Sequence, residues 1–178
     1  DLVGGLISYL SDNNLLSPEE TLTIYLNTLK SMNTEQMGNY LGIESLLNTS
    51  DSDKNSIASA LVEQVHQNFD FKITNCEEQG YTATVSTTIT TFDSTSILNT
   101  FSQEQDAYLS SADAVIDGSE KRYQKSLEML LNDIKNNTAN ITSTADFHLT
   151  NYGVSWKLDD SNTTIGNAIF GTLSNSPV

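Results

Sequence analysis

The sequence predicts an α+β fold in which helices pack against one face of an antiparallel sheet. Apolar residues recur with helical spacing in the N-terminal third of the chain and again between residues 93 and 137. Four shorter segments instead alternate apolar residues with polar ones, as strands with one buried face do. The two kinds of segment are grouped rather than strictly alternated, which favours α+β over a parallel α/β fold. A chain of 178 residues without repeats or a Pro/Gly-rich linker fits one domain over residues 1–178, of which residues 1–16 are poorly defined.

The first of three predicted N-terminal helices covers Ser17–Met32. Ser17 is a favourable N-cap, Pro18 suits the first helical position, and Glu20 completes a capping box. One stripe of this helix is apolar and is expected to be buried. It consists of Leu22, Tyr25, Leu26 and Leu29.

Two further helices are predicted over Thr34–Leu41 and Asp53–Phe69. Asn33 caps the shorter helix and Gln36 closes a second capping box. Amphipathic helices in succession need a common apolar partner. Their inward stripes are Met37, Tyr40 and Leu41 in the shorter helix, and Ile57, Ala58, Leu61, Val65 and Phe69 in the longer one.

Four strands are predicted to form that partner. Residues 70–74 and 81–90 indicate a hairpin with its turn at Gly80, and residues 141–150 and 152–158 a second pair with its turn at residues 151–153. A last helix is expected over residues 163–173. The inward residues of these segments are Phe71, Ile73, Tyr81, Ala83, Val85, Thr87, Ile89, Ile141, Ala145, Phe147, Leu149, Tyr152, Val154, Trp156, Leu158, Ile165, Ile169 and Phe170.

Residues 93–137 are predicted to be a helical insertion between the second and third strands. Gly118 breaks or bends this run and Ser119 can cap a helix that starts after it, so we expect two helices, for which an antiparallel hairpin is one arrangement. Their apolar stripes are Ile97, Leu98, Phe101, Tyr108, Leu109, Ala112 and Ile116, and then Tyr123, Leu127, Leu130, Leu131 and Ile134.

Composition and charge exclude several classes of partner. The chain is 37% hydrophobic and 17% charged, and Ser, Thr and Asn make up about a third of it, a pattern associated with exported bacterial proteins. A net charge of −15 disfavours nucleic acid and anionic membrane surfaces. Lys121, Arg122 and Lys125 form the one basic cluster, which we interpret as a solvated helix face. No run approaches the length of a membrane span.

Several polar groups are candidates for sites of chemistry. Cys76 lies in a predicted strand without a nearby base, so a buried or half-buried thiol is expected. Asp146 and His148 share a strand face and could hold a metal or polarise a water molecule, but that face is the Thr-rich one assigned to solvent. His66 lies at the edge of a helical stripe and is interpreted as a boundary histidine. No catalytic residue, metal site or cofactor is predicted.

Two polar segments have simpler interpretations than a site. Residues 51–55 mimic the start of a calcium loop, but Ser56 and Val62 stand where Gly and Glu are required, so helix capping by Asp51 or Ser52 is preferred. Residues 159–162 are interpreted as a turn whose acidic groups complement a helix N-terminus. Asn-x-Ser/Thr sequons matter only in a eukaryotic secretory pathway, and they begin at Asn48, Asn136, Asn140 and Asn162.

Two stretches carry a family resemblance: ETLTIYLNTLKSMNTEQMGNYL (Glu20–Leu41) and YGVSWKLDDSNTTIGNAIFG (Tyr152–Gly171). They resemble extracytoplasmic lipoproteins of Gram-positive bacteria with a nuclear-transport-factor-2-like (cystatin-like) domain of unknown function. The resemblance covers roughly residues 17–92 and 139–171. It implies a cone-shaped, curved sheet around helices, and a lipid anchor on a cysteine upstream of Asp1. The matching positions are Tyr25, Leu26, Leu29, Lys30, Asn33, Tyr40, Leu41, Trp156, Lys157, Leu158 and Gly171.

Three functions remain open from the sequence. The preferred one is a non-enzymatic binding or interaction domain at the cell surface, whose Thr/Asn/Ser face meets a protein, a glycan or a wall polymer. The second is a small-ligand binder, or an enzyme of the isomerase or dehydratase type, that uses a cavity in the cone. The third is a structural homodimer packed through the exposed sheet face. The candidate cavity residues are Tyr25, Tyr40, Tyr152 and Trp156.

Overall fold

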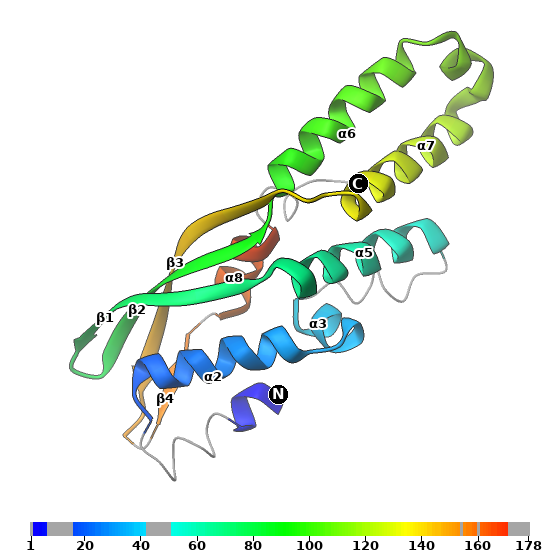
Figure 1. Ribbon diagram of the computed structural model, residues 1–178. Coiled ribbons are helices and arrows are strands. Elements are labelled where there is room, and N and C mark those ends of the chain that lie inside the picture. Colours follow the sequence, from blue (N-terminus) through cyan, green and yellow to red (C-terminus); the bar gives the residue numbers. More distant parts are fainter. Residues whose placement is uncertain (1, 7–15, 42–50, 154, 160, 171–178) are drawn as a thin grey trace.

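The computed structural model describes residues 2–6, 16–41, 51–153, 155–159 and 161–170 (Figure 1). Within these residues the predicted α+β class is confirmed, as a four-stranded antiparallel sheet with strand order β1-β2-β3-β4 and helices beside it. No helix in the described ranges is long and apolar enough to cross a lipid bilayer. The elements in chain order are α2 (Pro18–Ser31), α3 (Thr34–Leu41), α5 (Ser52–Asn68), β1 (Asp70–Gln79), β2 (Thr82–Phe92), α6 (Ser94–Leu109), α7 (Ala112–Lys135), β3 (Asn140–Asn151), β4 (Trp156–Leu158) and α8 (Ser161–Phe170).

The N-terminal helices begin where their capping residues predict. The Ser17 hydroxyl accepts from the Glu20 amide at 3.1 Å, and the Glu20 carboxylate accepts from the Ser17 amide at 3.3 Å. Asn33 and Gln36 make the same reciprocal pair at the start of α3. Asp51 caps α5 by accepting from the amides of the two residues after Ser52, so the calcium-like run is a helix cap as expected.

A bulge in β1 determines which of its side chains face the helices. The pairing of β1 with β2 is regular up to Ile73 and resumes at Asn75, so Thr74 is an extra residue in the ladder. Successive side chains of a strand point to opposite faces of the sheet. The extra residue therefore switches which alternate residues of β1 face the helices. Phe71 and Ile73 face the helices before the bulge, and Cys76, opposite Val85, faces them after it.

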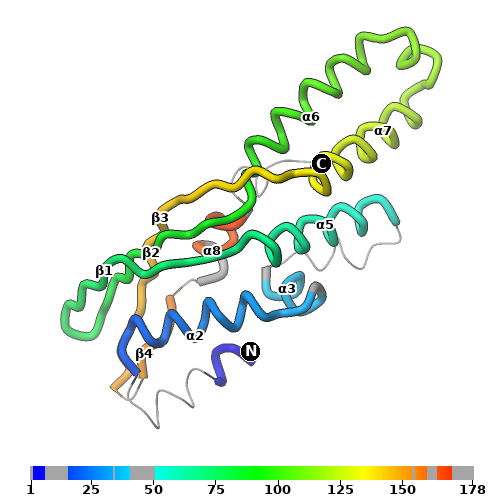
Figure 2. Tube along the Cα trace, viewed as in Figure 1, coloured from blue at the N-terminus to red at the C-terminus, as the bar shows by residue number. Residues whose placement is uncertain are grey.

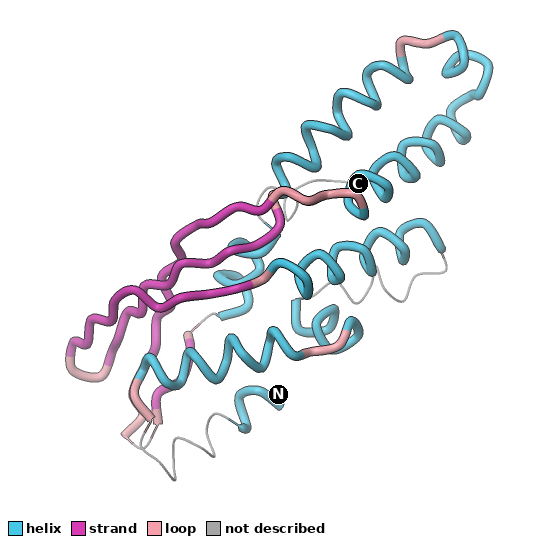
Figure 3. The backbone as a smooth tube through the Cα atoms, in the orientation of Figure 1, coloured by secondary structure: helices cyan, strands magenta, loops and turns pink. Residues whose placement is uncertain are grey.

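The two faces of the sheet differ sharply in their helical cover. Alternate residues of β2 are buried on the inner face, which α2, α5 and α8 cover (Figure 3). α2 contacts β1, β2 and β4, while α8 contacts β2 and β3, so the cover is not confined to the N-terminal helices that we predicted. The core holds the largest fully buried side chains of these elements: Leu22, Leu26, Leu29, Met37, Ile89, Phe92, Phe147, Leu149, Ile165 and Ile169.

The predicted helices between the second and third strands form an antiparallel hairpin, here called the arm (α6 and α7). Figures 1 and 2 show the arm extending away from the sheet, with the C-terminal part of α7 beside α5. Ser94 and Ile97, both in the first turn of α6, are the buried residues of that helix. Gly118, at φ 80° and ψ 171°, interrupts α7 as the sequence suggests, but the turn between the two helices lies earlier, at residues 110–111.

Several predicted inward residues are exposed instead. Tyr81 is 74% exposed because β2 begins only at Thr82, and Tyr152 is 64% exposed because β4 begins only at Trp156. In the arm, the turn at residues 110–111 divides the predicted stripe, which leaves Ile116 80% exposed. The other predicted inward residues that are exposed instead are Leu109, Ala112, Tyr123 and Ile141.

Some predictions fall outside the described residues or side chains. The side chains of Leu41, Asn162 and Phe170, and residues Gly42, Asn48, Val154, Asp160 and Gly171, are among them. The last helix begins at Ser161, two residues before the predicted start. Its predicted end at Leu173 lies beyond the last described residue.

Candidate binding face

The face of the sheet opposite the helices is lined by hydroxyl and other polar groups. Register places its side chains in rows that cross β1, β2 and β3, one strand after another. None of these residues is buried. We call this surface the open face, and its rows are Asp70–Thr90–Thr142, Lys72–Thr88–Thr144, Asn75–Ser86–Asp146, Glu77–Thr84–His148 and Gln79–Thr82–Thr150.

Hydrogen bonds between strands hold part of the open face in place. The Thr90 and Thr142 hydroxyl oxygens lie 3.3 Å apart, and the Thr84 hydroxyl lies 3.2 Å from Nδ1 of His148. At the β4 side, Thr150 donates to the Asp159 carboxylate at 2.8 Å. Each hydroxyl has one donor and two acceptor positions, so these contacts leave hydrogen-bonding capacity directed at solvent.

Asp146 and His148 lie on the open face, as the alternation predicts. Both side chains are exposed, and they occupy neighbouring rows on β3. Within the described ranges, no group of three or more His, Cys, Asp or Glu side chains is placed to hold a metal ion. The pair therefore contributes to the polar surface of the open face.

The four candidate cavity residues do not gather around one site. Tyr25 is 4% exposed and Trp156 9% exposed, and both belong to the hydrophobic core. Tyr40 is half-buried and its ring packs against that of Tyr25, with centroids 5.8 Å apart. Tyr152 lies outside the core, where the Lys157 ammonium stands over its ring. Core packing thus holds for three of the predicted residues and is wrong for Tyr152.

Cys76 and His66 show no arrangement for nucleophilic chemistry. Burial raises the pKa of the Cys76 thiol to about 11, helped by a hydrogen bond with Glu19, so the thiol is protonated and weakly nucleophilic at neutral pH. His66 is half-buried at the edge of α5, as predicted for a boundary histidine. Its Nε2 atom is buried and has no hydrogen-bond partner among the described residues.

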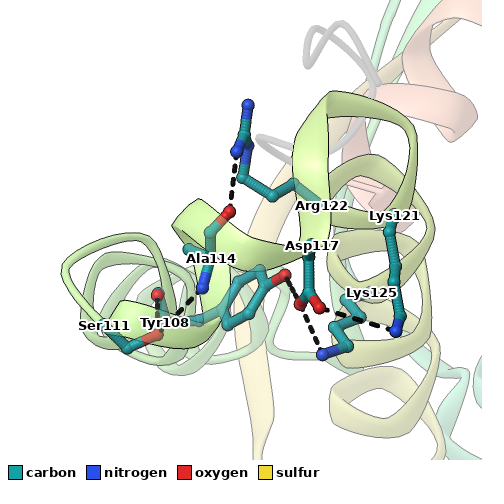
Figure 4. Close-up of polar contacts among 7 residues, drawn as sticks. All are labelled: Tyr108, Ser111, Ala114, Asp117, Lys121, Arg122 and Lys125. Atoms are coloured by element: carbon teal, nitrogen blue, oxygen red, sulfur yellow. Dashed lines mark hydrogen bonds and ion pairs between the residues drawn. The ribbon is translucent and has the colours of Figure 1, made fainter.

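The basic cluster of the arm is partly solvated, with the Lys121 side chain 60% and the Lys125 side chain 36% exposed, but it also makes polar contacts that the sequence does not indicate. Figure 4 shows that Lys121 and Lys125 converge on Asp117, whose side chain is 8% exposed. Lys125 donates to Asp117 at 2.5 Å, and so does the Tyr108 hydroxyl from α6. Arg122 donates to the carbonyl of Ala114 at 2.6 Å, across the break at Gly118.

These contacts shift the ionisation of the groups that make them. The hydrogen bonds from Lys125 and then Tyr108 hold the pKa of Asp117 down at about 2. The bond to Asp117 raises the pKa of Lys125. Burial, and then the bond to Asp117, raise the pKa of Tyr108. The sequence does place Asp117 and Lys121 one helical turn apart, but nothing in it indicates that Tyr108 joins them.

A second acidic site lies between the helices of the arm. Burial raises the pKa of Asp133 on α7 to about 6, and the neighbouring Glu104 on α6 adds to the effect. The Oδ2 atom of Asp133 is buried without a hydrogen-bond partner among the described residues. The surroundings of Asp117 thus stabilise its ionised form, whereas those of Asp133 destabilise its ionised form.

Comparisons with known proteins point to a shared fold. No protein-family model and no curated protein matches the sequence. One solved structure is similar: a protein described as a "putative lipoprotein (ycdA)" from Bacillus subtilis subsp. subtilis str. 168. The TM-score is 0.50 at 15% sequence identity, over 84% of this chain and 47% of that one. This chain thus spans about half the length of that protein, and the likeness is one of fold.

Proposed function

We propose that this chain is a non-enzymatic binding domain that presents its open face to a hydroxyl-rich polymer outside the cell membrane. The proposal includes a nuclear-transport-factor-2-like (cystatin-like) classification, and membership of a Gram-positive surface lipoprotein anchored upstream of Asp1. The sequence resemblance motivates both, and the fold likeness to a described lipoprotein supports them. The observation that carries the function is the set of polar rows on the open face.

The chemistry of the open face suits a neutral polymer better than a folded protein. Its central rows carry Thr and Ser, whose hydroxyls donate and accept and whose methyl or methylene groups can contact sugar C–H groups. Large apolar or aromatic side chains, which dominate the energetics of protein–protein interfaces, are not among its rows. A single hydrogen bond contributes only about 0.5–1.5 kcal/mol net. Repeated contacts along a polymer would raise the apparent affinity through multivalency.

An enzymatic function has less support from the arrangement of side chains. Tyr25 and Trp156, two of the candidate cavity residues, pack in the core. The one cysteine is protonated at neutral pH, and Asp146 and His148 face solvent. We therefore expect no turnover from this domain, and we expect binding at the surface and not in a cone cavity.

A direct test is a thermal-shift and calorimetric screen with defined probes. We would use N-acetylglucosamine oligosaccharides of increasing length, a soluble peptidoglycan digest, and calcium as a non-saccharide comparison. The proposal expects binding to strengthen with oligosaccharide length and to stabilise the fold by mass action. Binding that does not depend on length, or no binding to any polysaccharide, would contradict it. A concentration-dependent dimer in light scattering that the Thr88→Glu substitution abolishes would instead support a homodimer through this face.

A further inference from the structure

A polar groove of about 380 Å³ lies where α5 meets the end of α7. It is separate from the open face and from the arm's polar contacts. Its volume falls in the range of roughly 300–1,000 Å³ that is usual for small-molecule sites. Ser59, Glu63, Gln64 and Gln67 line it from α5, and Lys135 lines it from α7.

Gln64 is fixed so that its amide nitrogen remains available. Its side-chain oxygen accepts from Asn137 at 3.1 Å and from Asn68 at 3.4 Å. The orientation of Asn137 is itself fixed, because it donates to the Ala139 carbonyl and accepts from the Ala139 amide. Although Gln64 is only 4% exposed, no described residue accepts a hydrogen bond from its amide nitrogen. Gln64 is among the residues that line the groove, and its side-chain amide carries two N–H donors.

Two opposite charges line the same groove without neutralising one another. Glu63 accepts a hydrogen bond from Gln67 at 2.9 Å, which positions its carboxylate. Lys135 makes no ion pair with any described residue, Glu63 included, although both side chains line the groove. A ligand with a single charge would be attracted by one of these groups and repelled by the other. A ligand with both charges, held apart, is attracted by both.

We propose that this groove binds a small zwitterion, namely a free α-amino acid or a short peptide with both ends free. The Lys135 ammonium and the Gln64 amide hold the carboxylate, and the Glu63 carboxylate holds the ligand ammonium. The Ser59 hydroxyl is available to a peptide amide. A neutral saccharide would leave both charges of the groove without a partner, and a phosphate would be repelled by Glu63.

Calorimetry with the full chain tests this assignment. The probes are alanine, di- and trialanine, their N-acetylated and C-amidated forms, and glucose as a neutral comparison. Each blocked end is expected to weaken binding at least about tenfold, because each removes one charge contact. Comparing the affinity for alanine with that for the peptides shows whether the groove prefers a free amino acid or a short peptide. No binding at probe concentrations up to about 10 mM, beyond the range of even weak small-ligand sites, or equal binding of blocked and free forms, would overturn the proposal.

Variants on the rim of the groove separate binding from folding. Lys135→Gln and Glu63→Gln change exposed residues, so both proteins should fold and both should bind the free probe at least about fivefold more weakly. Lys157→Gln and Glu120→Gln, outside the groove, are the matched controls and should keep the wild-type affinity. Retained affinity in both groove variants would contradict the assignment. Because open-face variants leave the groove intact, failure of the polymer screen and failure of this test can be told apart.

Discussion

The body of the molecule, consisting of the sheet with α2, α5 and α8, is stabilised differently from the arm. In the body, helices and strands share one apolar core whose largest side chains are fully buried. In the outer part of the arm, Val115 and Ile116 are about four-fifths exposed, and the two helices are joined there by polar contacts to Asp117. Burial of apolar surface therefore stabilises the body, whereas hydrogen bonds and ion pairs with small net contributions hold the end of the arm.

This difference predicts separate responses of the two regions to mutation and pH. A core substitution should lower the stability of the whole fold. A substitution near Gly118 or Asp117 should act on the arm alone, because locally stabilised segments open without global unfolding.

The largest effect is expected from Ile89→Ala in the body. Ile89 is fully buried on the inner face of β2, so its truncation leaves a cavity and costs about 2–5 kcal/mol. Urea denaturation monitored by circular dichroism measures the loss. Its neighbour Thr88, on the open face, is the control, and Thr88→Ala should change stability by less than about 0.5 kcal/mol. Equal losses for the two variants would remove the distinction between the faces.

Gly118→Ala should come next, with its effect confined to the arm. The backbone at φ 80° and ψ 171° is accessible almost only to glycine, so alanine there costs about 1–3 kcal/mol. Hydrogen exchange should show lost protection over residues 112–125 and little change in the sheet. Gly166→Ala in α8 is the control, since an added methyl meets no atom within 4 Å and its helical backbone suits alanine. Loss of protection throughout the sheet would contradict a separately stabilised arm.

Asp133→Asn is expected to stabilise the arm at neutral pH by about 1 kcal/mol, because it removes a charge that burial and then Glu104 disfavour. Partial exposure to solvent screens these effects and keeps the gain small. The pKa of Asp133 is raised from 3.8 to about 6, so folding favours its protonated form. That contribution is complete below pH 3.8 and is lost as the pH rises through about 6. Hydrogen exchange of α6 and α7 should therefore slow in the variant at about pH 7.5 but not at about pH 3. Glu128→Gln on α7 controls for net charge, and an equal gain in that variant would refute the role of Asp133.

The smallest effect on global stability is expected from Asp117→Asn. The pKa of Asp117 is lowered from 3.8 to about 2, so its contribution is present above 3.8 and is lost as the pH falls through about 2. The variant should lose protection at residues 108–125 at neutral pH without a measurable change in the urea midpoint. It should also lack the acid-dependent step of the wild type near pH 2. Asp113→Asn is the matched control, and an effect of the same size there would argue against the contacts of Asp117.

The sequence predicts the body much better than the arm, and the reason is physical. Alternation along β2 identifies Ala83, Val85, Thr87 and Ile89 as inward, because one face of that strand is buried and the other is not. Caps such as Ser17 likewise depend on local contacts alone. In the arm, apolar periodicity leads to the wrong expectation for Ile116, because the contacts that order this segment are polar.

The candidate sites are less predictable than the fold. The Thr-rich face is expected from alternation, but its rows depend on register across three strands and on the bulge at Thr74. The alternation pattern predicts Tyr152 to face inward on the assumption that the fourth strand begins at Tyr152. In the structure Tyr152 lies in an Asn151–Gly153 turn, and β4 begins later, at Trp156. The groove on α5 depends on Lys135 and Asn137, which lie about 70 residues away in sequence. No short-range pattern reports contacts of that kind.

The central claim is that the open face of the body, and not the arm, binds a hydroxyl-rich polymer. The most direct measurement is the affinity for the longest bound N-acetylglucosamine oligosaccharide of three proteins: wild type, the Thr88→Glu/Thr144→Ala variant and the arm variant Ile116→Ser. We predict that the open-face variant binds at least about tenfold more weakly while the arm variant binds as the wild type does. Normal binding by the open-face variant, with loss of binding in the arm variant, would contradict the account.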